Sequence, residues 1–90
     1  MKIERLVSWF SIEDEAFVGE IVIDQIELDT LKDIFKPHSS DPLMYNPYLI
    51  NEEIAKKLQQ HLRFDFDFEK FIYQVDCFQV DSINSVQTDA

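Results

Sequence analysis

The sequence is poor in glycine, cysteine and histidine, and each scarcity excludes a class of site. Its 90 residues contain one glycine, one cysteine and two histidines. A glycine-rich phosphate loop needs several glycines, so Gly19 alone cannot form one. Because Cys77 has no second cysteine, the chain forms no intramolecular disulfide and has no Cys/His cluster for zinc, which fits a reducing cytoplasm. We therefore expect no cofactor and no metal.

Basic residues are also scarce, which restricts the possible partners. Eight Lys and Arg residues stand against eighteen acids, and the formal net charge is -10. This charge repels nucleic-acid phosphates and anionic lipids. It attracts a basic protein surface, although the same charge also keeps a small domain soluble. The N-terminal "MKIERLVSWF" carries charge and no apolar run long enough for a signal peptide or a membrane span. We expect a cytoplasmic protein that binds neither nucleic acid nor membrane.

Apolar residues, in contrast, are plentiful and follow strand patterns. They make up 46% of the chain and include eight phenylalanines, enough for a core, while the length allows one domain without a large cavity. Residues 3–12, 17–23 and 71–80 are rich in β-branched and aromatic residues, as strands are. The acids Glu13, Asp14 and Glu15 then lie at a hairpin turn. Gly19, inside the second strand, indicates a bulge or a close backbone approach.

Two helices are predicted between the second and third strands. Asp24 and Glu27 have the spacing of a capping box, and Pro37 ends the first helix. Asn51 is a suitable cap for the second. The connection, residues 37–50, holds all three prolines and is long for a compact domain. Its apolar content predicts a lid over the core, or an aromatic contact surface that includes Tyr45 and Tyr48.

These elements predict an α+β domain over residues 1–81 with a tail at 82–90. The sheet is expected to have three antiparallel strands with two helices packed on one face, in the order ββααβ. The third strand is expected to pair with the first.

The stretch "RFDFDFEKF", residues 63–71, alternates phenylalanines with acids. The apolar alternation slips by one residue near Glu69 and Lys70, which predicts a turn or bulge that leaves the acids on its outer side. Asp65, Asp67, Glu69 and Asp76 match positions 1, 3, 5 and 12 of a calcium-binding loop. Lys70 replaces the glycine that such a loop needs at position 6, so calcium binding is disfavoured. His38 and His61 have no nucleophile at a recognisable motif spacing.

In size, acidity and expected ββααβ order, the chain resembles the small acidic immunity proteins of bacterial toxin/immunity systems, including those of contact-dependent growth inhibition. The resemblance implies a non-enzymatic protein that binds and neutralises a cognate toxin, often a basic nuclease. The residues expected to contact the toxin are Asp65, Asp67, Glu69, Glu13, Asp14 and Glu15, with Tyr45 and Tyr48 as weaker candidates. The alternative is a structural or regulatory adaptor that acts through a sheet edge, the proline-containing loop or self-association. A small hydrolase that depends on His38 or His61 is a third possibility.

Overall fold

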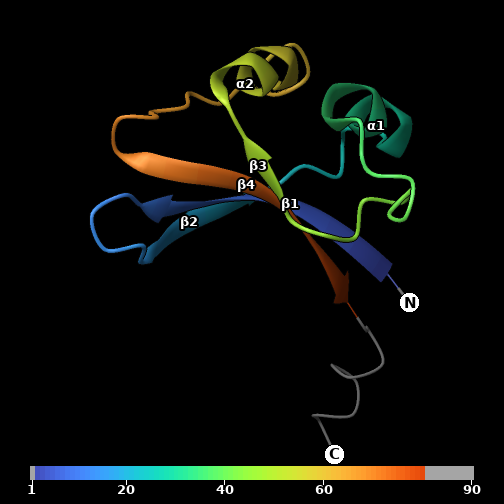
Figure 1. Ribbon diagram of the computed structural model, residues 1–90, viewed down its shortest axis with the longest axis horizontal. Helices are drawn as coiled ribbons and strands as arrows, with labels where there is room; N and C mark the ends of the chain where they lie inside the picture. The colour runs from blue at the N-terminus through green and yellow to red at the C-terminus, as the bar shows by residue number, and fades with distance from the viewer. Residues whose placement is uncertain (1, 81–90) are drawn as a thin grey trace, which may run out of the picture.

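Two long antiparallel strands form the centre of the fold in a computed structural model, which describes residues 2–80 and leaves the side chains of positions 2 and 80 undescribed. The expected tail at 82–90 lies outside the described residues. The elements in chain order are β1 (Lys2–Ser11), β2 (Phe17–Val22), α1 (Leu28–Phe35), β3 (Tyr48–Ile50), α2 (Glu52–Leu58) and β4 (Phe71–Val80). The sheet order is β2-β1-β4-β3, and both helices lie over one face (Figure 1). The predicted α+β class is confirmed.

The predicted three-stranded sheet is wrong, because β3 adds a fourth strand. Tyr48 pairs with Val75 and Ile50 with Tyr73, so β3 lies antiparallel to β4 at one edge. The chain order is therefore ββαβαβ and not ββααβ. Three residues are too few to show an alternating pattern, and Pro47 before them favoured a loop. The predicted pairing of the last strand with the first is confirmed along the whole length of β1 and β4.

The hydrophobic core lies between the sheet and the helices. Val7 on β1 and Val75 on β4 face each other there, and both are buried. Leu31 of α1 and Leu58 of α2 are fully buried against them. Met44 from the connection between α1 and β3 is also buried in this core. The connection thus covers part of the core, as the lid interpretation predicts.

Gly19 combines the two features predicted for it. It pairs with Trp9, and the register shifts between Trp9 and Phe10, which marks a bulge in the β1–β2 hairpin. A Cβ atom at position 19 would lie 2.6 Å from Cζ2 of Trp9. Glycine is therefore required by the close approach of the indole ring, since the φ angle of this residue is not positive.

The two helices begin differently. The Asn51 side chain accepts a hydrogen bond of 2.8 Å from the Ile54 N–H, so the predicted cap of α2 is confirmed. The predicted start of α1 at Asp24 is wrong, because this helix begins at Leu28. Asp24 instead accepts a 3.0 Å hydrogen bond from the N–H of Arg5, whose carbonyl oxygen accepts one from Ile23. Asp24 therefore extends the β1–β2 pairing by one residue beyond the end of β2.

Neither helix within residues 2–80 has the length and apolar character needed to cross a membrane.

Candidate functional site

Two turns that are far apart in the sequence meet at one end of the sheet. The hairpin turn between β1 and β2 lies beside the turn that precedes β4, because Ser11 pairs with Phe71 at the ends of the two strands. The N–H of Ile12 donates a 3.0 Å hydrogen bond to the carbonyl oxygen of Lys70 across this junction. The β1–β4 pairing thus sets the hairpin turn with residues 13–15 beside the turn that contains Glu69, whereas Asp65 lies farther back in the same segment, beside Gln59 and Arg63 at the end of α2. We call the surface formed by residues 13–15 and 65–69 the acidic end.

All three acids of the hairpin turn are exposed, and one of them also closes the turn. Glu15 has a φ of 60° and donates its N–H to the Ser11 carbonyl oxygen over 2.8 Å. The Asp14 carboxylate accepts a 3.1 Å hydrogen bond from the N–H of Ala16 and so helps to close the turn. Glu13 and Glu15 are exposed, and no hydrogen bond of the turn occupies their carboxylates. Asp14 is exposed and also helps to hold the turn, whereas Glu13 and Glu15 are exposed without a role in closing it.

The phenylalanines of residues 63–71 pack inward around one tyrosine. The ring centroids of Phe64, Phe66 and Phe68 lie 5.9, 4.8 and 5.3 Å from that of Tyr73. The Tyr73 hydroxyl accepts a 2.8 Å hydrogen bond from the Asp67 N–H. This packing confirms that the phenylalanines close the core. Of the acids between them, Asp65 and Glu69 are exposed as predicted, but the predicted display of Asp67 is wrong because Asp67 is half-buried.

The turn predicted near Glu69 and Lys70 is also present. The carbonyl oxygen of Asp67 accepts hydrogen bonds from the N–H groups of Lys70 and Phe71, at 3.2 and 3.0 Å. The Asp67 carboxylate accepts one of 3.2 Å from the N–H of Glu69. Asp67 is half-buried, whereas Asp65 and Glu69 are exposed. Asp67 therefore plays the same role in this turn as Asp14 does in the hairpin.

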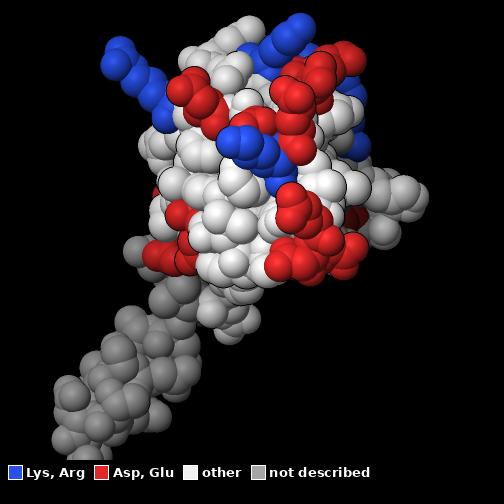
Figure 2. All heavy atoms as spheres, turned by 90° about the vertical axis from the view of Figure 1, so that its left-hand side faces the viewer, with Lys and Arg blue, Asp and Glu red and all other residues white. Residues whose placement is uncertain are grey.

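The acidic end combines carboxylates with exposed apolar side chains. Glu13 and Glu69 line one shallow hollow of about 320 Å³ between the two turns, together with Ile12 and Lys70. Ile12 is 44% exposed. Figure 2 looks onto this end with the helices at the top; Asp and Glu side chains lie across the lower part of the described surface, and a Lys or Arg side chain lies near the centre of the view. Apolar residues beside charged ones are typical of a protein interface, with its apolar centre and polar rim.

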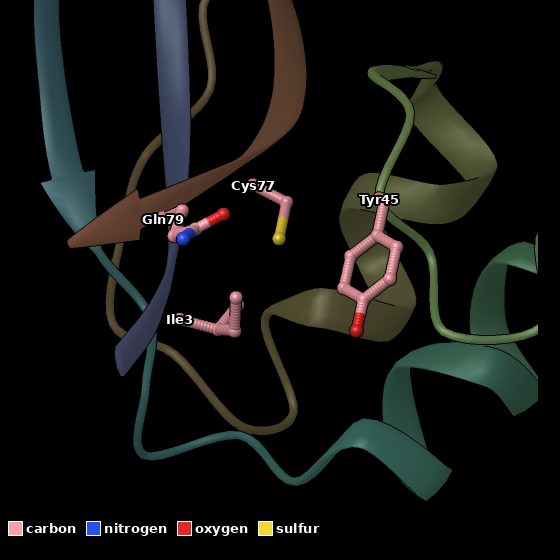
Figure 3. Close-up of a pocket in the computed structure, with 4 residues that line it drawn as sticks. All are labelled: Ile3, Tyr45, Cys77 and Gln79. Carbon is pink, nitrogen blue, oxygen red and sulfur yellow. The ribbon is translucent and has the colours of Figure 1, made fainter. Parts of the chain in front are cut away.

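Tyr45 and Tyr48 lie away from the acidic end. Tyr45 is exposed across a pocket of about 290 Å³ from Ile3, Cys77 and Gln79 (Figure 3). Ile3 and Ser11 are at opposite ends of β1, roughly 26 Å apart at the rise of an extended strand. Tyr48 is half-buried in β3, and its ring lies edge-on to Phe35 at 6.0 Å. The structure thus brings together the two acid runs but neither tyrosine.

The sequence did not single out Asp41, which organises the connection between α1 and β3. This buried carboxylate accepts hydrogen bonds from the Tyr48 hydroxyl at 2.6 Å, the Tyr45 N–H at 2.8 Å and the Asn46 N–H at 3.1 Å. The Tyr48 hydrogen bond, with smaller contributions from the backbone hydrogen bonds and the charge of Arg5, holds the pKa of Asp41 below its usual value. The same bond raises the pKa of Tyr48. The Asp-Pro pair at 41–42 is a turn signal that could have identified this residue.

Arg5 joins the same connection to the sheet. It lies on β1, and its guanidinium donates a 2.6 Å hydrogen bond to the carbonyl oxygen of Leu43. This cation is therefore directed into the connection and away from the acidic end.

The residues with potential catalytic chemistry are dispersed. Burial raises the pKa of the Cys77 thiol, and the nucleophilic thiolate is therefore scarce at neutral pH. His38 contacts the Ser40 hydroxyl at 2.8 Å within one exposed loop, and His61 is exposed just after α2. The described residues contain no group of three or more His, Cys, Asp or Glu side chains that could hold a metal ion.

The comparison with protein families covers most of the structure. Residues 4–76 match the domain of unknown function DUF7683. The chain belongs to the DUF7683 family. The DUF7683 match includes both turns of the acidic end and the connection organised by Asp41, so these features lie within the family's own domain. A search of curated proteins found no match.

Proposed function

We propose that this DUF7683 protein is an immunity protein, which binds a basic protein toxin through the acidic end and neutralises it in the cytoplasm of the producing cell. The observation that carries the proposal is the hydrogen bond between Ile12 and Lys70, which joins the two acidic turns. This bond holds Glu13 and Glu69 at one hollow, so the two turns offer one surface to a partner.

Electrostatics supports a basic partner. A net charge of -10 accelerates association with a positively charged surface, and the acidic end gives the encounter an orientation. If the partner is a nuclease, carboxylates placed where it binds phosphates would compete with its substrate. Close charge pairs across such interfaces couple by about 1.5–7 kcal/mol.

The division of roles among the acids supports a display surface. Asp14 and Asp67 accept backbone hydrogen bonds inside their turns. Asp67 is half-buried and Asp14 is exposed, and the remaining acids, Glu13, Glu15, Asp65 and Glu69, are exposed. The turn-closing aspartates fix the backbone from which the exposed carboxylates project, which reduces the ordering cost on binding. Tyr45 would touch the same partner only across the length of the sheet.

The direct test is co-expression with a toxin domain encoded immediately upstream of the gene. We expect the two proteins to co-purify, and we expect the complex to weaken as the salt concentration rises, because exposed charges are screened. We also expect the protein to block the toxin's activity. A toxin that stays fully active in a saturating excess of the protein would contradict the proposal.

The alternative, an adaptor that acts by strand pairing, is favoured by one observation. Within residues 2–80, β2 pairs with β1 alone and forms an edge of the sheet. An edge strand offers backbone N–H and C=O groups to another chain. Concentration-dependent self-association in sedimentation, with little dependence on salt, would favour the adaptor over the immunity protein.

A further inference from the structure

The face of the sheet that the helices leave uncovered carries a row of apolar side chains beside the acidic end. Phe10 of β1 pairs with Phe17 of β2 on one side and with Ile72 of β4 on the other, so the three side chains lie on one face in one row. The rings of Phe10 and Phe17 are 5.8 Å apart in an edge-to-face arrangement. Phe17 is 56% exposed and Ile72 is 39% exposed. This apolar row crosses three strands.

A hollow of about 310 Å³ lies over this row, lined by Phe10, Glu15, Ile72 and Gln74. The Gln74 side chain donates a 2.7 Å hydrogen bond to Asp76, so its amide nitrogen has a partner and its carbonyl oxygen is an acceptor. The hollow therefore combines an aromatic ring, a carboxylate and an amide oxygen. An Arg guanidinium or a Lys ammonium binds favourably to each of these groups.

The charge of the uncovered face supports a cationic occupant. Pairing with their neighbours places the acids Glu4, Glu20 and Asp76 on this face. Among the described side chains of this face, these acids carry the only charges; Glu20 is exposed, Glu4 is half-buried and Asp76 is buried. A second copy of the chain would bring the same negative charges together, which is unfavourable. A basic protein has the complementary charge.

We propose that this hollow receives a Lys or Arg side chain of a basic partner protein, and that the Phe17, Phe10 and Ile72 row forms the apolar core of the same contact. This inference takes the nature of the partner, a basic protein, from the proposed function. It adds the place on the sheet at which that partner makes contact. Glu15, at the border between the acidic end and the hollow, pairs with the incoming cation. Phe10 contacts its face or its aliphatic stem.

The test uses the full chain and a defined probe, the peptide acetyl-Leu-Arg-Leu-amide, followed by NMR chemical shifts. The matched peptide carries citrulline, which is uncharged and similar in shape, in place of arginine. We expect saturable shifts centred on Phe10, Ile72 and Gln74 with the arginine peptide. We expect Glu15→Gln to weaken binding about two- to fivefold, as for an exposed ion pair, and citrulline to weaken it to a similar or greater extent.

Two control substitutions separate the hollow from the general charge. Asp33→Asn removes one exposed charge from α1, on the helix-covered side of the sheet, and should change the affinity for the peptide by less than about twofold. Ile72→Thr should weaken binding. Val22→Thr changes a residue of similar exposure that lies on the same face but outside the hollow, and it should leave the binding of the peptide unchanged.

The outcomes distinguish the hollow from the proposed function. The proposal that the hollow binds a cationic side chain would be contradicted by any of three results. These are equal affinity for the two peptides, shifts centred on residues 13 and 69, or no shifts at all. Each of these results leaves the immunity function to be decided by toxin inhibition. If the arginine peptide binds at the hollow but the protein does not inhibit the toxin, cation binding at the hollow would be supported and the immunity function would be contradicted. Self-association that Ile72→Thr abolishes would show that a second copy covers the face, and would overturn the proposal.

Discussion

The indole ring of Trp9 lies over the α-carbon of Gly19 on the neighbouring strand, at a distance that leaves no room for a side chain. The ring centroid of Trp9 is also 5.0 Å from that of Phe64 and 6.1 Å from that of Tyr73. Trp9 therefore connects the β1–β2 hairpin to the segment that carries Asp65 and Asp67. The aromatic cluster that contains Trp9 supports both halves of the acidic end.

Replacing Gly19 with alanine should destabilise the fold. The new methyl group would displace the Trp9 ring, and overpacking of this kind lowers the free energy of unfolding by about 1–3 kcal/mol. Urea denaturation followed by circular dichroism measures the change. Glu20→Ala, at an exposed position on the same strand, is the control and should change the free energy by less than about 0.5 kcal/mol. Equal losses in the two variants would show that the contact with Trp9 is unimportant.

Asn51 provides a test of helix capping near β3. Asn51→Ala removes the acceptor for the Ile54 N–H and should lower the free energy of unfolding by about 1 kcal/mol. Asn51→Ser retains a side-chain oxygen and should recover most of the loss. Thermal and urea unfolding of the two variants measure the difference. If serine and alanine destabilise the protein equally, the hydrogen bond is not the source of the effect.

The hydrogen-bonded carboxylate of Asp41 should make the stability of the protein depend on pH. Its pKa is lower in the folded protein than in the unfolded chain, so its carboxylate stabilises the fold fully above the ordinary pKa of 3.8. This contribution is lost as the pH falls through the lower, folded-state pKa. The difference in unfolding free energy between the wild type and Asp41→Asn should therefore be constant near neutral pH and shrink below about pH 4. The comparison cancels the titration of the other acids, and a difference that is independent of pH would contradict this role.

The residues that the sequence placed correctly are those whose signals are local. The Asn51 cap, the strand alternation of β4 and the slip near Glu69 and Lys70 each follow from a few neighbouring side chains. The start of α1 was misplaced because Asp24 has the spacing of a helix cap. In the fold, its side chain instead accepts a hydrogen bond from the backbone N–H of Arg5 on β1. No local pattern marked β3, whose three residues gain their conformation from β4.

The candidate site shows the same limit. Both acid runs were recognisable in the sequence, and so was the exposure of all their acids except Asp67. Their proximity was not, since it depends on the register that places Ser11 opposite Phe71. The hollow at Phe10 and Gln74 also depends on that register, and no sequence motif describes it.

The dissociation constant of the toxin complex, measured by calorimetry at several salt concentrations, tests the central claim most directly. The test variant combines Glu13→Gln, Glu15→Gln, Asp65→Asn and Glu69→Gln, and spares the turn-closing Asp14 and Asp67. The matched control removes the same charge from exposed helix positions through Asp29→Asn, Asp33→Asn, Glu52→Gln and Glu53→Gln. Circular dichroism verifies that both variants are folded.

Wild type and the helix control should bind with similar affinity and a clear dependence on salt. The acidic-end variant should bind about tenfold more weakly or worse, which corresponds to the sum of several exposed ion pairs, and with a smaller dependence on salt. Equal affinities for all three proteins, or equal losses in the two variants, would contradict the claim that the acidic end is the binding surface.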